Sequence, residues 1–235
     1  MSFILNPMCP ICEVNDLSSS IESHVIPRWM IIKTKEIGKN VKVTEQRIHS
    51  KNQGDIKSKI VCKDCELRFK QDDDFAKTVF DSNMHIIEKH HEYTLFNSSE
   101  TFLGLRMFAF SILLRWHLYR NQEQHRNVLG PYFSVIRDLY RSKNDEYLVH
   151  PILLLRYNDL TDAIIYPILS KLEGKNCYIF TLINFEILIV VDKSYRPCES
   201  MKYAAIQGDR VLAMETNARN SKLIQFTRDI IKLHK

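Results

Sequence analysis

Two pairs of cysteines constrain this chain more than any other feature of its sequence. Cys9 and Cys12 form one Cys-x2-Cys pair, and Cys62 and Cys65 form a second. This spacing lets the two thiolates of one tight turn point toward the same ion, and two such turns complete a tetrahedral shell of four sulfur ligands. We therefore predict that the four cysteines bind one structural Zn²⁺ ion, around which the N-terminal third of the chain folds.

The composition is that of a globular protein, with 45% hydrophobic and 26% charged residues in 235. The longest apolar run, residues 102–116, contains Arg106 and Arg115. It is also shorter than the roughly 20 residues of a membrane span. The sequence after Met1 does not read as a secretion signal, which favours metal binding by the cysteines over disulfides. We expect a soluble, cytoplasmic protein that has no membrane partner.

Positive charge is concentrated between and around the two cysteine pairs. The net charge of the chain is +5, but residues 33–70 contain eleven Lys or Arg and five Asp or Glu, a surplus of six. Such a local surplus favours an acidic partner, most simply the backbone of a nucleic acid. The alternative interpretation is a solvated, lysine-rich loop.

Hydrophobic periodicity predicts an α+β protein in two parts. A polar stretch at residues 97–100 predicts a boundary between a zinc-binding domain, 1–97, and a C-terminal domain, 98–235. Residues 33–58 are expected to form a loop or a β-hairpin that includes a short strand at 41–44. Period-3.6 patterns predict helices at residues 63–80, 101–121, 132–141 and 218–234. Runs of β-branched and aromatic residues predict an antiparallel, strand-rich region at 152–157, 163–172, 177–183 and 186–192.

A second motif lies between the cysteine pairs. Residues 23–27 read Ser-His-Val-Ile-Pro, and Glu66 directly follows the last cysteine. With these residues the chain resembles HNH endonucleases, whose ββα-metal fold is often braced by a treble-clef-like four-cysteine zinc site. It is most similar to a bacterial group with the signature S-H-I-I-P followed by C-x2-C-E. An apolar helix at 110–116 and Leu-Gly-Pro at 129–131 extend the resemblance to about residue 140.

The resemblance implies a catalytic chemistry for three residues. His24 would be the general base that takes a proton from the attacking water. Glu66 stands where the family has a metal-binding Asn or His, so it would help to hold a catalytic Mg²⁺ or Mn²⁺ ion. Asp73 lies two helical turns further along the same face and is a second candidate. The chain departs from the family at Ser23, which replaces an Asp or Glu, and at the middle Asn, for which Asn52 and Asp55 are only nearby polar residues.

The expected function is therefore that of a metal-dependent HNH-type endonuclease that hydrolyses DNA phosphodiester bonds. The resemblance further implies a role in bacterial defence against phage or foreign DNA. The C-terminal region would then recognise substrate, or bind a second copy of the chain or another protein. Two alternatives stay open: a non-catalytic zinc-knuckle module that binds nucleic acid, and a protein-interaction adaptor in which zinc is purely structural.

Overall fold

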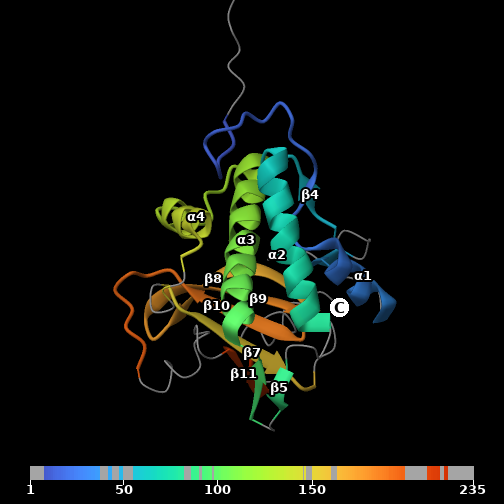
Figure 1. The fold of residues 1–235 in the computed structure, drawn as a ribbon, viewed down its shortest axis with the longest axis vertical. Helices are drawn as coiled ribbons and strands as arrows, with labels where there is room; N and C mark the ends of the chain where they lie inside the picture. Colours follow the sequence, from blue (N-terminus) through green and yellow to red (C-terminus); the bar gives the residue numbers. More distant parts are fainter. Residues whose placement is uncertain are drawn as a thin grey trace, which may run out of the picture.

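Helices and strands are mixed along the whole of the chain that the structure describes, which confirms the expected mixture of helix and sheet (Figure 1). The computed structural model describes residues 8–37, 42–43, 48–49, 55–81, 86–89, 92–96, 98–144, 146, 150–159, 163–198, 211–217 and 220–221. The helix expected over residues 218–234 lies outside this part of the chain, apart from residues 220–221.

Three of the expected helices are confirmed to within a few residues. They are α2, Lys63–Asp81; α3, Ser98–Gln124; and α4, Tyr132–Ser142. From Thr101 to Leu118 nearly every side chain of α3 is buried, so α3 is a central helix with no solvent face along this stretch. A further helix, α1 (Arg28–Ile37), was not predicted. It buries Met30 and Ile31, but its Lys-rich second half obscured the apolar periodicity.

Seven strands form one sheet in the order β5-β6-β11-β7-β10-β9-β8. The expected antiparallel meander of β8, β9 and β10 is confirmed, and β7 extends it beside β10. The neighbouring strands β11 and β7 run parallel. The strands are β5, Ile86–Lys89; β6, Tyr93–Phe96; β7, Ile152–Tyr157; β8, Ala163–Leu172; β9, Lys175–Ile183; β10, Phe185–Val190; and β11, Val211–Thr216.

Two small strand pairs lie in the N-terminal part. Strand β1, Ser23–His24, pairs antiparallel with β4, Lys57–Ser58, and α2 begins five residues after β4. Strand β2, Lys42–Val43, pairs with β3, Ile48–His49, which confirms a hairpin within residues 33–58. Strand β1 carries His24, and helix α2 begins directly after Cys62 and contains Cys65.

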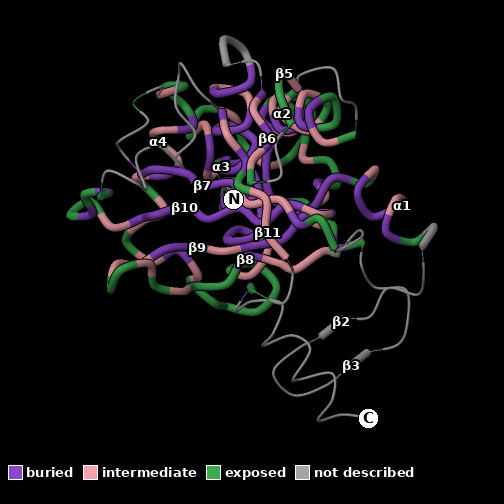
Figure 2. The backbone as a smooth tube through the Cα atoms, turned by 90° about the horizontal axis from the view of Figure 1, so that it is seen from below, coloured by how far each residue is buried: buried purple, intermediate pink, exposed green. Residues whose placement is uncertain are grey.

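One hydrophobic cluster runs through the described residues from Cys9 to Ala213. Helices α2 and α3 lie side by side over the sheet (Figure 1). Most residues of α3, β7 and β10 are buried (Figure 2). Strands β5 and β6 precede the expected boundary at residue 97, yet belong to the same sheet as β7–β11. The division at residue 97 stays a prediction. Among the described helices, α3 included, none has the length and apolar character that crossing a membrane requires.

Candidate metal centre and histidine site

The four predicted cysteines converge on one point. Their sulfur atoms all lie within 4.8 Å of one another, and the Cys9–Cys65 and Cys12–Cys62 sulfur pairs are both 3.8 Å apart. A tetrahedral zinc ion with Zn–S bonds of about 2.3 Å separates its sulfur ligands by about 3.8 Å. A disulfide would instead need about 2.05 Å. The geometry is therefore compatible with zinc and excludes disulfides among these residues.

Hydrogen-bond donors around the sulfur atoms favour the thiolate form that binds a metal. The backbone N–H of Cys62 lies 3.4 Å from Cys9 Sγ, and the Asn15 side-chain amide lies 3.6 Å from Cys62 Sγ. The pKa of Cys9 lies well below its ordinary value, chiefly because of its hydrogen bond with Cys65, whereas burial raises the pKa of Cys62 and the contact with Cys9 raises that of Cys65. Outer-shell donors of this kind orient ligands and stabilise the bound state.

The first cysteine pair is tied to the rest of the molecule by Glu13. This residue adopts a left-handed backbone conformation, with φ of 58°, directly after Cys12. Its carboxylate forms ion pairs with Arg137 and, at 3.0 Å, with Arg141, both on α4. The four-cysteine cluster is therefore connected to α4 through Glu13. It is connected to α2 because Cys65 lies in the first turn of that helix.

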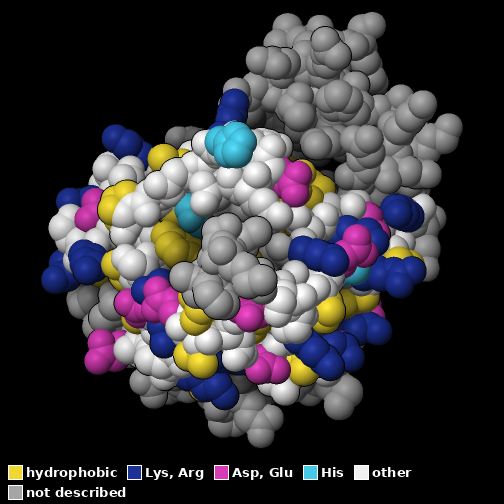
Figure 3. Space-filling model, turned by 90° about the horizontal axis from the view of Figure 1, so that it is seen from above, with side chains coloured by type: hydrophobic (Ala, Val, Ile, Leu, Met, Phe, Trp, Pro, Cys, Tyr) yellow, Lys and Arg dark blue, Asp and Glu magenta, His cyan; other side chains and the backbone are white. Residues whose placement is uncertain are grey.

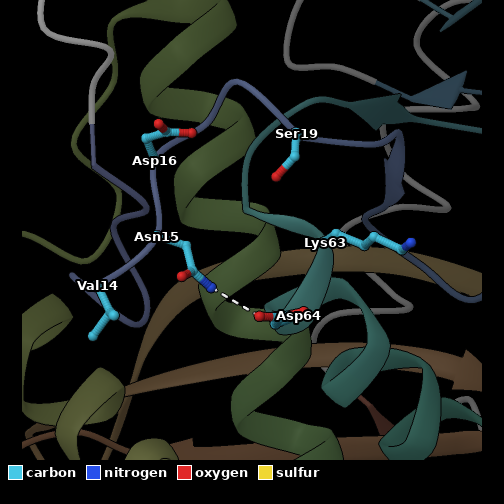
Figure 4. A pocket seen from close by; sticks show the side chains of 6 residues that line it. All are labelled: Val14, Asn15, Asp16, Ser19, Lys63 and Asp64. Carbon is cyan, nitrogen blue, oxygen red and sulfur yellow. Dashed lines mark hydrogen bonds between the residues drawn. The ribbon is translucent and has the colours of Figure 1, made fainter.

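An open depression of about 420 Å³ lies beside the first cysteine pair and the start of α2. Figure 4 shows its lining, with Asn15 donating to Asp64 Oδ2 at 2.9 Å across the depression. The other carboxylate, Asp16, accepts hydrogen bonds from Ser18, which lower its pKa. Both acids therefore have protein partners. The Asn15–Asp64 hydrogen bond connects the loop after Cys12 to the start of α2. The lining residues are Val14, Asn15, Asp16, Ser19, Lys63 and Asp64.

His24 lies on β1 with its side chain 27% exposed. Its Nε2 is 3.2 Å from Oδ1 of Asp55, which immediately precedes the β4 region. Beside the pair, Lys57 of β4 forms an ion pair with Glu22 across the two strands. The imidazole is thus held by a carboxylate and still reaches solvent, as a proton-transferring histidine must.

Glu66 and Ser23 face each other behind His24. Burial raises the pKa of the Glu66 carboxyl, and a hydrogen bond from the Ser23 side chain and the positive charge of Arg115 oppose this rise. Apart from this contact with each other, Glu66 Oε2 and Ser23 Oγ are buried without a hydrogen-bond partner among the described residues. Buried polar atoms are normally paired. The Ser23 hydroxyl can serve as the partner of the Glu66 carboxylate, and only the remaining capacity of that carboxylate is open to a water molecule or a cation.

Asp73 is engaged by a buried arginine. Nη1 and Nη2 of Arg115 donate to Asp73 Oδ2 and Oδ1 at 2.8 and 2.6 Å, a bidentate pair. Burial raises the pKa of Asp73, and Arg115 and His24 oppose the rise. Both carboxylate oxygen atoms are thus bound by protein, which leaves Asp73 poorly placed to hold a metal ion.

Asp73 lies within electrostatic range of both His24 and Glu66. Two further residues, Asp55 and Arg115, were not recognised from the sequence as members of this site. Arg115 carried a signal, because a charged residue inside an apolar helix needs a buried partner. Asp55 carried none beyond its place in the segment before the second cysteine pair. In the described residues, the four cysteines are the only group of three or more side chains arranged to bind a metal.

The basic surplus is partly neutralised where the structure describes it. Lys33 pairs with Asp81 at 2.6 Å, and Lys57 pairs with Glu22. Figure 3 shows Lys and Arg side chains interspersed with Asp and Glu over the face seen from above. Several basic residues of the segment 33–70, those at 39, 47 and 51 among them, lie outside the described residues.

No protein-family model, no curated protein and no solved structure matches the chain. The functional argument therefore depends on the geometry of the site itself.

Proposed function

We propose that this chain is a metal-dependent, HNH-type endonuclease that hydrolyses phosphodiester bonds of DNA. The observation that carries the proposal is the pair formed by His24 Nε2 and Asp55 Oδ1, 3.2 Å apart, beside the four-cysteine centre. The order of elements supports it, because an antiparallel pair of strands, β1 and β4, leads into helix α2. Helix α1 and the β2–β3 hairpin lie between β1 and β4 in the chain, so a ββα-metal unit here would carry them as an insertion, with His24 on its first strand.

The His24–Asp55 pair can act as a general base. Asp55 Oδ1 faces Nε2 at 3.2 Å, which favours the tautomer with its proton on Nε2 and a free lone pair on Nδ1. That nitrogen takes the proton of an attacking water molecule, and the adjacent carboxylate stabilises the imidazolium that forms. Base catalysis of this kind contributes roughly 10²- to 10⁴-fold to a rate.

Two metal ions belong to the proposal, with separate roles. Zn²⁺ would be held by the four cysteines and would fix the start of α2, and with it Glu66, relative to the first knuckle. Mg²⁺ or Mn²⁺ would be held by Glu66, whose buried carboxylate offers the oxygen ligands that these cations prefer. When bound, this second ion supplies charge stabilisation at the scissile phosphate. Asp73 is assigned to Arg115 and not to the ion.

One observation favours the alternative of a zinc-braced module that binds nucleic acid without cutting it. Within the described residues, no acidic cluster accompanies the four cysteines as a second group of three potential metal ligands. Such a module would bind DNA through Lys and Arg of residues 33–70, and its affinity would fall steeply with salt concentration.

Plasmid nicking separates the two functions. The full chain is incubated with supercoiled plasmid and Mg²⁺ or Mn²⁺, together with His24→Ala and Asp55→Asn. His125→Ala is the matched control, because His125 is an exposed histidine just after α3. We expect His24→Ala to lower the nicking rate about 10²- to 10⁴-fold and Asp55→Asn to lower it as well. Absence of nicking by the wild type, or equal nicking by His24→Ala, would reject the nuclease; salt-sensitive DNA binding would then support the binding module.

A further inference from the structure

Arg115 on α3 is the most completely bonded polar side chain near His24. Its exposed fraction is 0%, and its guanidinium lies 5.1 Å over the ring of Phe69. An arginine side chain has five N–H donors. Here five hydrogen bonds use them: Nε to Ser111 O, Nη1 to His24 O and Asp73 Oδ2, and Nη2 to Asp73 Oδ1 and Ser111 Oγ.

This saturation excludes a direct role in binding a phosphate. An arginine that recognises a phosphate presents free N–H groups to it in a forked arrangement. Arg115 has no N–H to spare, and no part of the side chain reaches solvent. Its contact with the site is instead made through the backbone carbonyl of His24, at 2.9 Å from Nη1.

The strand that carries His24 needs such support. Strand β1 has two residues, and its pairing with β4 joins only Ser23 to Ser58 and His24 to Lys57. A strand pair this short is not stable by itself. The guanidinium connects the His24 carbonyl to two long helices at once, to α2 through Asp73 and to α3 through its own backbone.

We propose that Arg115 is a positioning residue, which fixes the backbone of His24 against α2 and α3 and so sets the direction of the imidazole. The inference rests on the proposed nuclease function for its effect on rate. Its structural content, the placement of His24, is independent of that function. A displacement of about 1 Å at a reacting group can cost about 10²-fold in rate.

Helix α3 offers a matched control in Arg106. This arginine is also buried, 1% exposed, and lies 4.8 Å over the ring of Phe110. It donates to the carbonyl oxygen atoms of Asn144 and His150. Replacing either arginine by lysine keeps the charge and removes the fork of donors. Only the replacement of Arg115 changes a contact with β1.

The experiment compares Arg115→Lys with Arg106→Lys in the full chain, with two readouts. For Arg115→Lys we expect kcat of nicking to fall about 10²-fold with KM unchanged. The imidazole NMR resonances of His24, assigned by their loss in His24→Ala, should shift as well. Arg106→Lys should leave both kcat and the His24 resonances as in the wild type. The kcat values are compared per folded protein, with the folded fraction measured by circular dichroism.

The outcomes distinguish this inference from the nuclease proposal. If the wild type does not nick DNA, the nuclease proposal fails, and the His24 resonances alone decide the role of Arg115. If Arg115→Lys does not fold, Asp73→Asn carries the same test, because it keeps the guanidinium and weakens its anchor on α2. Unshifted His24 resonances in the folded variant, or equal shifts in Arg106→Lys, would overturn the inference.

Discussion

The contact between α2 and α3 can be tested at Gly104, where the structure reverses an ordinary expectation. Gly104 lies inside α3, and a glycine-to-alanine change in a helix interior normally stabilises a protein by about 1 kcal/mol. A Cβ atom at Gly104, however, would lie 2.2 Å from Cε1 and 2.4 Å from Cδ1 of Phe75 on α2. These are ring atoms, so the helices or the whole ring must move.

The two effects have opposite signs, and the clash is the larger. Overpacking a well-packed interface costs about 1–3 kcal/mol. With a clash of about 2 kcal/mol and a propensity gain of about 1 kcal/mol, we expect Gly104→Ala to lower the free energy of unfolding by about 1 kcal/mol. For a protein of this size, that corresponds to a fall in Tm of about 2–4 °C.

Urea denaturation in a double-mutant cycle measures the clash directly. The matched background is Phe75→Leu, in which the smaller side chain makes room for the new methyl group. There Gly104→Ala should become neutral or stabilising by up to about 1 kcal/mol. The reasoning is refuted if Gly104→Ala raises the free energy of unfolding of the wild type. It is also refuted if the substitution changes that free energy equally in both backgrounds. The close packing of α2 on α3, which also sets Asp73 against Arg115, would then be wrong.

Two further predictions concern the metal and the pH. Metal analysis should find one zinc ion per chain in the wild type and less zinc in Cys65→Ser. The control is Cys198→Ser, which should keep its zinc because Cys198 is exposed and distant in sequence from the four cysteines. Wild-type protein without zinc would contradict the site. Burial raises the pKa of Asp72 to about 6, although Tyr140 donates a hydrogen bond of 2.6 Å to it. The folded state therefore binds this proton more tightly than the unfolded state, and stability falls as pH rises from about 4 to about 6, by up to about 3 kcal/mol. Urea denaturation should show Asp72→Asn gaining stability relative to the wild type over this interval, and a constant difference would count against the assignment.

Local patterns in the sequence predicted a large part of the fold. The cysteine spacing identified all four residues of the metal centre, because a Cys-x2-Cys turn brings its two thiolates together without help from the rest of the chain. The periodicity of α2, α3 and α4 placed these helices to within a few residues. The β8–β9–β10 meander was predictable for the same reason, since short turns pair neighbouring strands.

The tertiary structure decided which distant residues meet. Strand β11 lies between β6 and β7, and no turn signal can predict a pairing between strands so far apart in the sequence. The partner of His24 is Asp55, and its carbonyl is held by Arg115, 91 residues away. Asp73 was assigned from the helical repeat to a metal-binding face, but the repeat describes only one helix.

The sequence by itself therefore determined the groups whose chemistry depends on local spacing: the cysteine centre, the helices and the histidine motif. Only the packing of α3 against α2 and β1 decided how these groups are used. A buried guanidinium must find acceptors for its N–H groups. The acceptors of Arg115 are Asp73 and the strand of His24, so this side chain connects β1 to helices α2 and α3.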